Sequence, residues 1–134
     1  MRLLTDHIVE GDSANHQLEI QVLDDPGQGG ANHLYAITGF DHSTNPGSRI
    51  PAFGKGDFDL VLFQNGPIKE FGVNGVTQEA LLAIVIDRLR SFQAGPYACE
   101  DNRLALEHSE AALGLLQKRT RARIARGVEG THQK

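Results

Sequence analysis

The spacing of apolar residues changes near residue 72 and divides the chain into two patterns. Before this point, apolar residues alternate with polar ones or form short runs bounded by Gly, Pro, Asn and Asp. Such segments are typical of β-strands with one buried face. We therefore predict strands at 18–22, 34–37 and 60–63, with a weaker strand that includes Ile8 and Val9.

Turn-forming residues fill the connections between these strands. The string DDPGQGGAN, between the first two strong strands, predicts a hairpin with a long, mobile tip. Residues 41–59 show little periodicity and contain several Gly, Pro, Ser and Asn residues, so we predict a surface loop there.

Beyond this change in spacing, two long segments have the apolar pattern of α-helices. Thr77 is a suitable N-cap for the first helix, which we predict at 78–94. Gly95 and Pro96 follow it as a stop signal. The apolar residues of this helix are spread widely, so we expect burial on two sides. The second helix is predicted at 102–125, and the short connection favours an antiparallel hairpin.

These patterns predict an α+β fold, with a small N-terminal antiparallel β-sheet in 1–71 and a long C-terminal antiparallel helical hairpin in 72–134. The length of 134 residues fits a single domain. The second helix has a seam of Leu and Ala that the first helix covers only in part, so we expect self-association. The alternative is a monomer whose sheet covers both helices. The seam consists of Leu106, Ala112, Leu113 and Leu116.

Composition is typical of a soluble globular protein. Hydrophobic residues make up 40% and charged residues 22%, so wholesale disorder is not expected. The single cysteine, Cys99, excludes an internal disulfide and fits a reducing cytosol, and we expect a small buried thiol there. The longest apolar run, at 80–86, is much shorter than the roughly 20 residues of a membrane span. We therefore expect no membrane partner.

Five of the thirteen basic residues lie in the string KRTRARIARG, at 118–127. The chain has a formal net charge of −4, and the rest of it carries −9 once these five charges are set aside. Arg119, Arg123 and Arg126 follow spacings of four and three and share one helix face. A solvated helix end, a nucleic-acid arm and a pocket for a phosphorylated ligand all have this pattern. The acidic remainder argues against nucleic acid as the partner.

Catalytic and metal-binding patterns are weak. The six histidines are scattered, with no pair at metal-ligand spacing, so we expect no metal site and no cofactor. No acid and base pair stands at a recognisable spacing, so we do not expect an enzyme. A phosphodiesterase-like hydrolase of nucleotide signals and a nucleic-acid-binding accessory protein that uses the Arg helix remain as alternatives to a binding protein.

Two strings carry a resemblance to a known family: FQNGPIKEFGVNGVTQEALLAIVIDRLRSFQAGPYACEDNRLAL and KRTRARIARGVEGTH. They resemble the C-terminal helical hairpin shared by phage Thoeris anti-defence sponges and phage anti-CBASS sponges. Proteins of this family capture nucleotide immune signals without cleaving them. The resemblance covers Phe63 to His132, and the β region before it makes the chain more similar to the Thoeris anti-defence type.

The resemblance implies two ligand sites. In FQAGPYACEDN, Phe92 matches the ring that stacks on the adenine of glycocyclic ADP-ribose, and Asn102 matches an amide that hydrogen bonds to this ligand. In RTRAR, Arg119 and Arg123 match residues that hold cyclic trinucleotides at a second site. Thr77 resembles a hydroxyl contact in that second site. The sequence leaves open which signal, including cyclic dinucleotides, binds best.

The resemblance also implies an assembly and a location. The family suggests a homo-oligomer, a hexamer built as three dimers, that acts in the cytoplasm of the infected bacterial host. Glu100 stands where sequences of this type often have Arg, and the missing cation could narrow the range of ligands.

Overall fold

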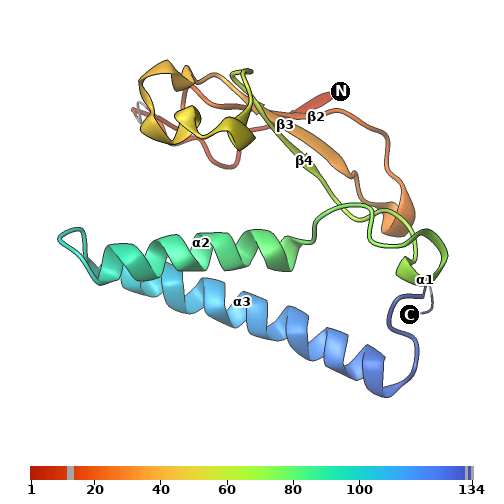
Figure 1. Cartoon of the computed structure of the whole chain (residues 1–134). Coiled ribbons are helices and arrows are strands. Elements are labelled where there is room, and N and C mark those ends of the chain that lie inside the picture. The colour runs from red at the N-terminus through yellow and green to blue at the C-terminus, as the bar shows by residue number, and fades with distance from the viewer. Residues whose placement is uncertain (12–13, 132, 134) are drawn as a thin grey trace. The chain divides into compact units, whose positions relative to one another are not determined.

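The computed structural model describes residues 1–11, 14–131 and 133. The chain divides into two compact units, Met1–Leu62 and Phe63–Lys134. The first unit contains a β-sheet and the second a pair of long helices (Figure 1), which confirms the predicted α+β class. The expectation of a single domain whose pattern changes near residue 72 stays a prediction.

The first unit is built on a four-stranded antiparallel sheet whose strands follow one another in chain order. Three strands lie where the alternating pattern predicts them, and the prediction of a strand at Ile8 and Val9 is wrong. The edge strand lies earlier, and the chain then turns so that the main-chain N–H of Ile8 donates to the carbonyl of Thr5 at 3.0 Å. The strands are β1 (Arg2–Leu4), β2 (Glu19–Val22), β3 (Leu34–Thr38) and β4 (Asp59–Leu62).

The register of the sheet decides which apolar side chains are buried. Val22 pairs with Arg2 on one side and Tyr35 on the other, and only 1% of its surface is exposed. Alternate residues of a strand point to opposite faces, so the neighbouring pair of Ala36 and Leu60 lies on the other face. There Ala36 is buried and Leu60 is exposed. The sheet therefore has a buried residue on each face, Val22 on one and Ala36 on the other.

The connection between β2 and β3 is held at its base by one carboxylate. Asp24 accepts hydrogen bonds from the main-chain N–H groups of His33 and Leu34, at 3.0 and 3.1 Å. Partial burial raises the pKa of Asp24, but these N–H donors outweigh it and hold the pKa below its ordinary value. The tip beyond this base contains a short 3₁₀ turn, η1 (Gln28–Gly30).

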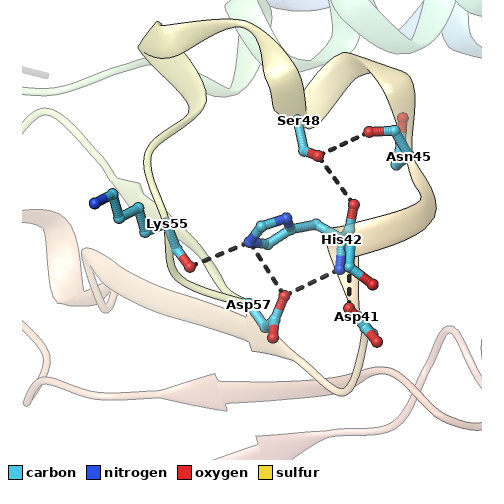
Figure 2. Close-up of polar contacts among 7 residues, drawn as sticks. Asp41, His42, Asn45, Ser48, Lys55 and Asp57 are labelled. Carbon is cyan, nitrogen blue, oxygen red and sulfur yellow. Dashed lines mark hydrogen bonds and ion pairs between the residues drawn. The ribbon is translucent and has the colours of Figure 1, made fainter.

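The predicted surface loop before β4 is organised around His42 (Figure 2). The main-chain N–H of His42 donates to Asp57 at 3.0 Å, and ring atom Nε2 lies 3.1 Å from the carbonyl oxygen of Lys55. Ser48 Oγ donates to the carbonyl oxygen of His42 at 2.9 Å. The loop contains three 3₁₀ turns, η2 (His42–Thr44), η3 (Pro46–Arg49) and η4 (Pro51–Phe53). These contacts give the segment a defined shape although its sequence lacks periodicity.

The helical unit contains a short helix and two long ones: α1 (Ile68–Phe71), α2 (Gln78–Gln93) and α3 (Glu100–Ala125). Thr77 caps α2 as predicted, since its Oγ1 accepts the main-chain N–H of Ala80 at 3.1 Å. The first turn of α3 begins two residues earlier than predicted because Cys99 acts as its N-cap, with Sγ 3.5 Å from the main-chain N of Asn102. No helix in the described part of the chain is both long and apolar enough to cross a membrane.

The two long helices pack side by side as an antiparallel hairpin (Figure 1). Ile86, at the middle of α2, is 2% exposed, and Arg90 pairs across the hairpin with Glu110 at 2.9 Å. The expectation that α2 is buried on two sides is wrong for the single chain, because Ile84 and Val85 remain exposed. On both long helices, buried and partly buried positions follow one another in steps of three and four residues, as in a coiled-coil seam. They include Leu82, Leu89, Leu106, Leu113 and Leu116.

The third helix continues past the start of α2 (Figure 1). It has 26 residues against 16 in α2, so about ten residues, or ~15 Å, extend beyond its partner. We call residues 116–125 the overhang and the described residues after Arg126 the tail. The tail turns back at Gly127, and Val128 is buried. Further along, the carbonyl oxygen of Gly130 accepts the main-chain N–H of Lys69 in α1 at 3.0 Å.

Candidate ligand-binding sites

Four side chains form a cluster that we call the bend site: Arg88, Phe92, Tyr97 and Asn102. Phe92 lies in the last turn of α2 and is 37% exposed. The Tyr97 ring stands edge-on to it, with 6.4 Å between centroids and an angle of 88°. The guanidinium carbon of Arg88 lies over the Phe92 ring, 5.4 Å from its centroid. An aromatic face beside a cation is suited to a ligand that combines a flat ring with a separate negatively charged group.

The amide of Asn102 belongs to the same cluster. Its Nδ2 donates to the main-chain carbonyl oxygen of Tyr97 at 3.3 Å. The connection is further held by Gln93, whose Oε1 accepts the main-chain N–H of Cys99 at 3.1 Å. Tyr97 therefore links Phe92 and Asn102, and the structure brings these two predicted site residues to the same end of the hairpin.

The other predicted site residues lie at the opposite end of the hairpin. Thr77 stands fifteen residues before Phe92, which corresponds to about 22 Å along a helix. Its oxygen already accepts a main-chain N–H as the N-cap, so its hydroxyl hydrogen is left to donate to another group. Arg119 and Arg123 lie in the overhang of α3. The structure thus places the candidate residues in two groups, at opposite ends of the hairpin.

The two overhang arginines differ in their surroundings. Arg119 is exposed and forms no hydrogen bond or ion pair within the described residues. Arg123 is half-buried, and its Nη2 donates to the carbonyl oxygens of Val128 and Thr131, each at 3.0 Å. Its Nη1 donates to the carbonyl oxygen of Gln133. Arg119 is therefore free to bind an anion, whereas Arg123 holds the tail against α3.

Glu100, in the first turn of α3, has a partner of its own. Both of its carboxylate oxygens bind Arg103, at 2.5 and 3.0 Å, and this hydrogen bonding and charge hold the pKa of Glu100 below its ordinary value. Glu107 binds the same guanidinium group at 2.6 Å. The two carboxylates raise the pKa of Arg103 further above its usual range. This network neutralises the carboxylate of Glu100.

Sequence reasoning missed two features of these sites. Arg88 is not among the residues that the resemblance implies, although its position four residues before Phe92 places both side chains on one helix face. The binding of Arg123 to the tail uses main-chain carbonyls, which have no signature in the sequence. The expectation that Cys99 is buried is wrong, since its side chain is exposed at the N-cap position of α3. Within the described chain, no group of three His, Cys, Asp or Glu side chains could hold a metal ion.

The fold and the sequence of the hairpin define its class. Residues 59–121 match the family described as Acb2/Tad1, hairpin domain. The helical unit is therefore similar to this hairpin domain, which confirms the resemblance found in the sequence.

A known phage protein is similar to this chain over more than half of its length. The chain is 49% identical over 79 residues to Thoeris anti-defense 1 of Bacillus phage SBSphiJ7. The aligned stretch is 59% of this chain and 56% of the relative, so the match spans about half the length of that protein.

Proposed function

We propose that this protein is a phage anti-defence sponge, which binds a nucleotide immune signal and sequesters it without cleavage. The observation that carries the proposal is the 49% identity to Thoeris anti-defense 1. The proposed ligands are glycocyclic ADP-ribose and cyclic di- or trinucleotides, and the blocked immunity is that of Thoeris, CBASS or both. The protein would act in the cytoplasm of the infected bacterial host.

The chemistry of the bend site supports binding of an adenine nucleotide. Phe92 presents a partly exposed ring on which a base can stack, and the nearby amide of Asn102 has both donor and acceptor atoms. Among the described contacts, Cys99 Sγ meets only the main-chain N of Asn102, as an N-cap, and no acid and base pair lies against either residue, so the arrangement favours capture over bond cleavage. The proposed role of the site is therefore retention of the intact signal.

The overhang supports a second, separate site for a larger anion. Arg119 is exposed there, and Thr77 has a hydroxyl hydrogen to donate. A single helix C-terminus is a poor place for an anion, because its partial charge is negative. Several chains in a symmetric assembly would bring enough arginines together to reverse this potential.

Self-association is also supported by apolar side chains on the helices that a single chain leaves exposed. Leu115 is 67% exposed, and Ile84 and Ile124 are each 59% exposed. Large exposed aliphatic groups of this kind favour burial against another copy. The proposed assembly is a hexamer made of three dimers.

A titration with recovery of the ligand tests the proposal. The purified protein is mixed with glycocyclic ADP-ribose, cyclic dinucleotides and cyclic trinucleotides in turn, and native mass spectrometry reports the subunit count and the bound mass. Heating the complex then releases the ligand. Recovery of intact signal supports a sponge, a cleaved product would make the protein a hydrolase, and no binding of any signal would refute the proposed function.

A further inference from the structure

Arg88 lies beside the aromatic ring of the bend site. It precedes Phe92 by one helical turn, so both side chains leave α2 on the same side. The guanidinium carbon is 5.4 Å from the ring centroid, within the range of a cation–π contact. Such a contact keeps a positive charge next to the surface on which a base would stack.

The other cations of this half of the hairpin are already neutralised. Arg90 binds Glu110 at 2.9 Å, and Arg103 binds Glu100 and Glu107. Within the described stretch 78–110, Arg88 is the arginine that no carboxylate binds. A charged group that makes its main contact with a ring face can exchange this contact for a stronger one with an anion.

The residues around the bend site carry a net negative charge, so binding of an anionic ligand there requires a cation that no carboxylate has neutralised. Residues 78–110 contain three arginines and six acidic residues, so this half of the hairpin is negative overall. A phosphate placed there without a cation would meet net repulsion. The guanidinium group of Arg103 cannot supply the missing charge, because two carboxylates occupy it. Arg88 remains as the group that can.

We propose that Arg88 is the phosphate-binding residue of the bend site: Phe92 stacks on the adenine, while the guanidinium group binds phosphate oxygens of the same nucleotide. This inference rests on the proposed function and names the residue that selects phosphorylated ligands. Arg offers a planar fork that matches two phosphate oxygens, which Lys does only in part. The ligand class is an adenine nucleotide whose phosphates lie within reach of the stacked base.

The test compares variants of the full chain in their binding of glycocyclic ADP-ribose, measured by calorimetry at low and high salt. Arg88→Gln keeps a hydrogen-bonding side chain and removes the charge, and Arg88→Lys restores the charge. Arg90→Gln is the matched control, because Arg90 lies on the same helix and is bound to Glu110. Phe92→Ala reports whether the bend site is used at all.

We expect Arg88→Gln to weaken binding by roughly 10- to 150-fold, as the loss of charge-assisted hydrogen bonds does. The salt dependence should also become shallower, and Arg88→Lys should recover part of the affinity. Arg90→Gln should stay within threefold of the unmodified protein. If Phe92→Ala weakens binding but Arg88→Gln binds as before with the same salt dependence, Arg88 only packs on the ring, and the proposed function stands without this inference. If both variants bind normally, the bend site itself is refuted.

Discussion

Arg123 donates a hydrogen bond to the carbonyl oxygen of Thr131, eight residues further along the chain, at 3.0 Å. The same guanidinium group also donates to the carbonyl oxygens of Val128 and Gln133. These bonds use the fork of Arg123 to hold the tail against the end of α3. A phosphate that binds Arg123 would have to compete with three main-chain acceptors, whereas Arg119 is open to solvent.

Replacement of Arg123 should therefore loosen the tail. We expect Arg123→Ala to speed amide hydrogen exchange of Val128 and Thr131 and to lower the free energy of unfolding by about 1–3 kcal/mol. Arg119→Ala is the control and should change stability by no more than about 0.5 kcal/mol, because its side chain is exposed. Unchanged exchange in Arg123→Ala would show that other contacts hold the tail.

The overhang site leads to a prediction about ligand selectivity. Arg119→Ala should weaken cyclic trinucleotide binding by roughly 10- to 150-fold, since a charge-assisted contact is lost. Binding of glycocyclic ADP-ribose should stay unchanged, because the bend site lies at the other end of the hairpin. Arg121→Ala, which removes a charge from a different helix face, is the control. Equal loss in both variants would indicate general attraction by the basic segment instead of a pocket.

The bend site predicts a loss of stacking when its ring is removed. Phe92→Ala should weaken binding of glycocyclic ADP-ribose by roughly 5- to 150-fold, as measured by calorimetry. Phe71→Ala is a suitable control, because Phe71 is an exposed phenylalanine in the same unit that lies outside the bend site. Circular dichroism should show that both variants keep their helices. A comparable loss in Phe71→Ala would point to a general effect on the fold.

Helix α2 has two isoleucines, two residues apart, that differ in burial and so suit a comparison of stability. Ile86 is 2% exposed and Ile84 is 59% exposed. Ile86→Ala should lower the free energy of unfolding by about 2–5 kcal/mol, and Ile84→Ala should change that of the isolated chain by no more than about 0.5 kcal/mol. Urea denaturation at low protein concentration measures both. If Ile84→Ala is as destabilising as Ile86→Ala, the outer side of α2 is buried in an assembly, as the proposed oligomer requires.

The parts of the fold that sequence reasoning predicted are those with local causes. Thr77 caps α2 through an N–H only three residues away, and the strands follow an alternation that is visible in the residues themselves. The cap at Cys99 escaped prediction because a thiol is an uncommon N-cap. The loop around His42 depends on Asp57, fifteen residues later, and a sequence without periodicity does not indicate such a contact.

The candidate sites also combine features with local causes and features that depend on distant parts of the chain. Phe92 and Asn102 were identified by resemblance, and the link between them runs through the main-chain carbonyl of Tyr97, which any residue would provide. The partners of Arg123 are carbonyl oxygens of the tail, so residue types alone do not separate Arg123 from Arg119. A contact between a side chain and the main chain depends on the path of the chain, and residue types alone do not specify that path.

The carboxylate of Asp24 predicts how the β unit responds to acid. Its pKa is held below the ordinary value because the N–H groups of Leu34 and His33 outweigh the effect of partial burial. A group whose pKa is lower in the folded state stabilises the fold above its unfolded pKa, about 3.9, and loses this effect as pH falls through the folded value. Asp24→Asn should therefore be less stable than the unmodified protein at pH 7, and the difference should shrink below about pH 4.

Urea denaturation at pH 7, 5 and 3 measures this difference. Asp25→Asn removes the same charge from the next residue, whose side chain makes no hydrogen bond within the described chain, and it should keep the acid dependence of the unmodified protein. A constant difference between Asp24→Asn and the unmodified protein at all three pH values would contradict the prediction. The bonds from the N–H groups of His33 and Leu34 would then stabilise the hairpin equally when the carboxyl group of Asp24 is protonated. The negative charge of Asp24 would have no part in closing the β2–β3 connection.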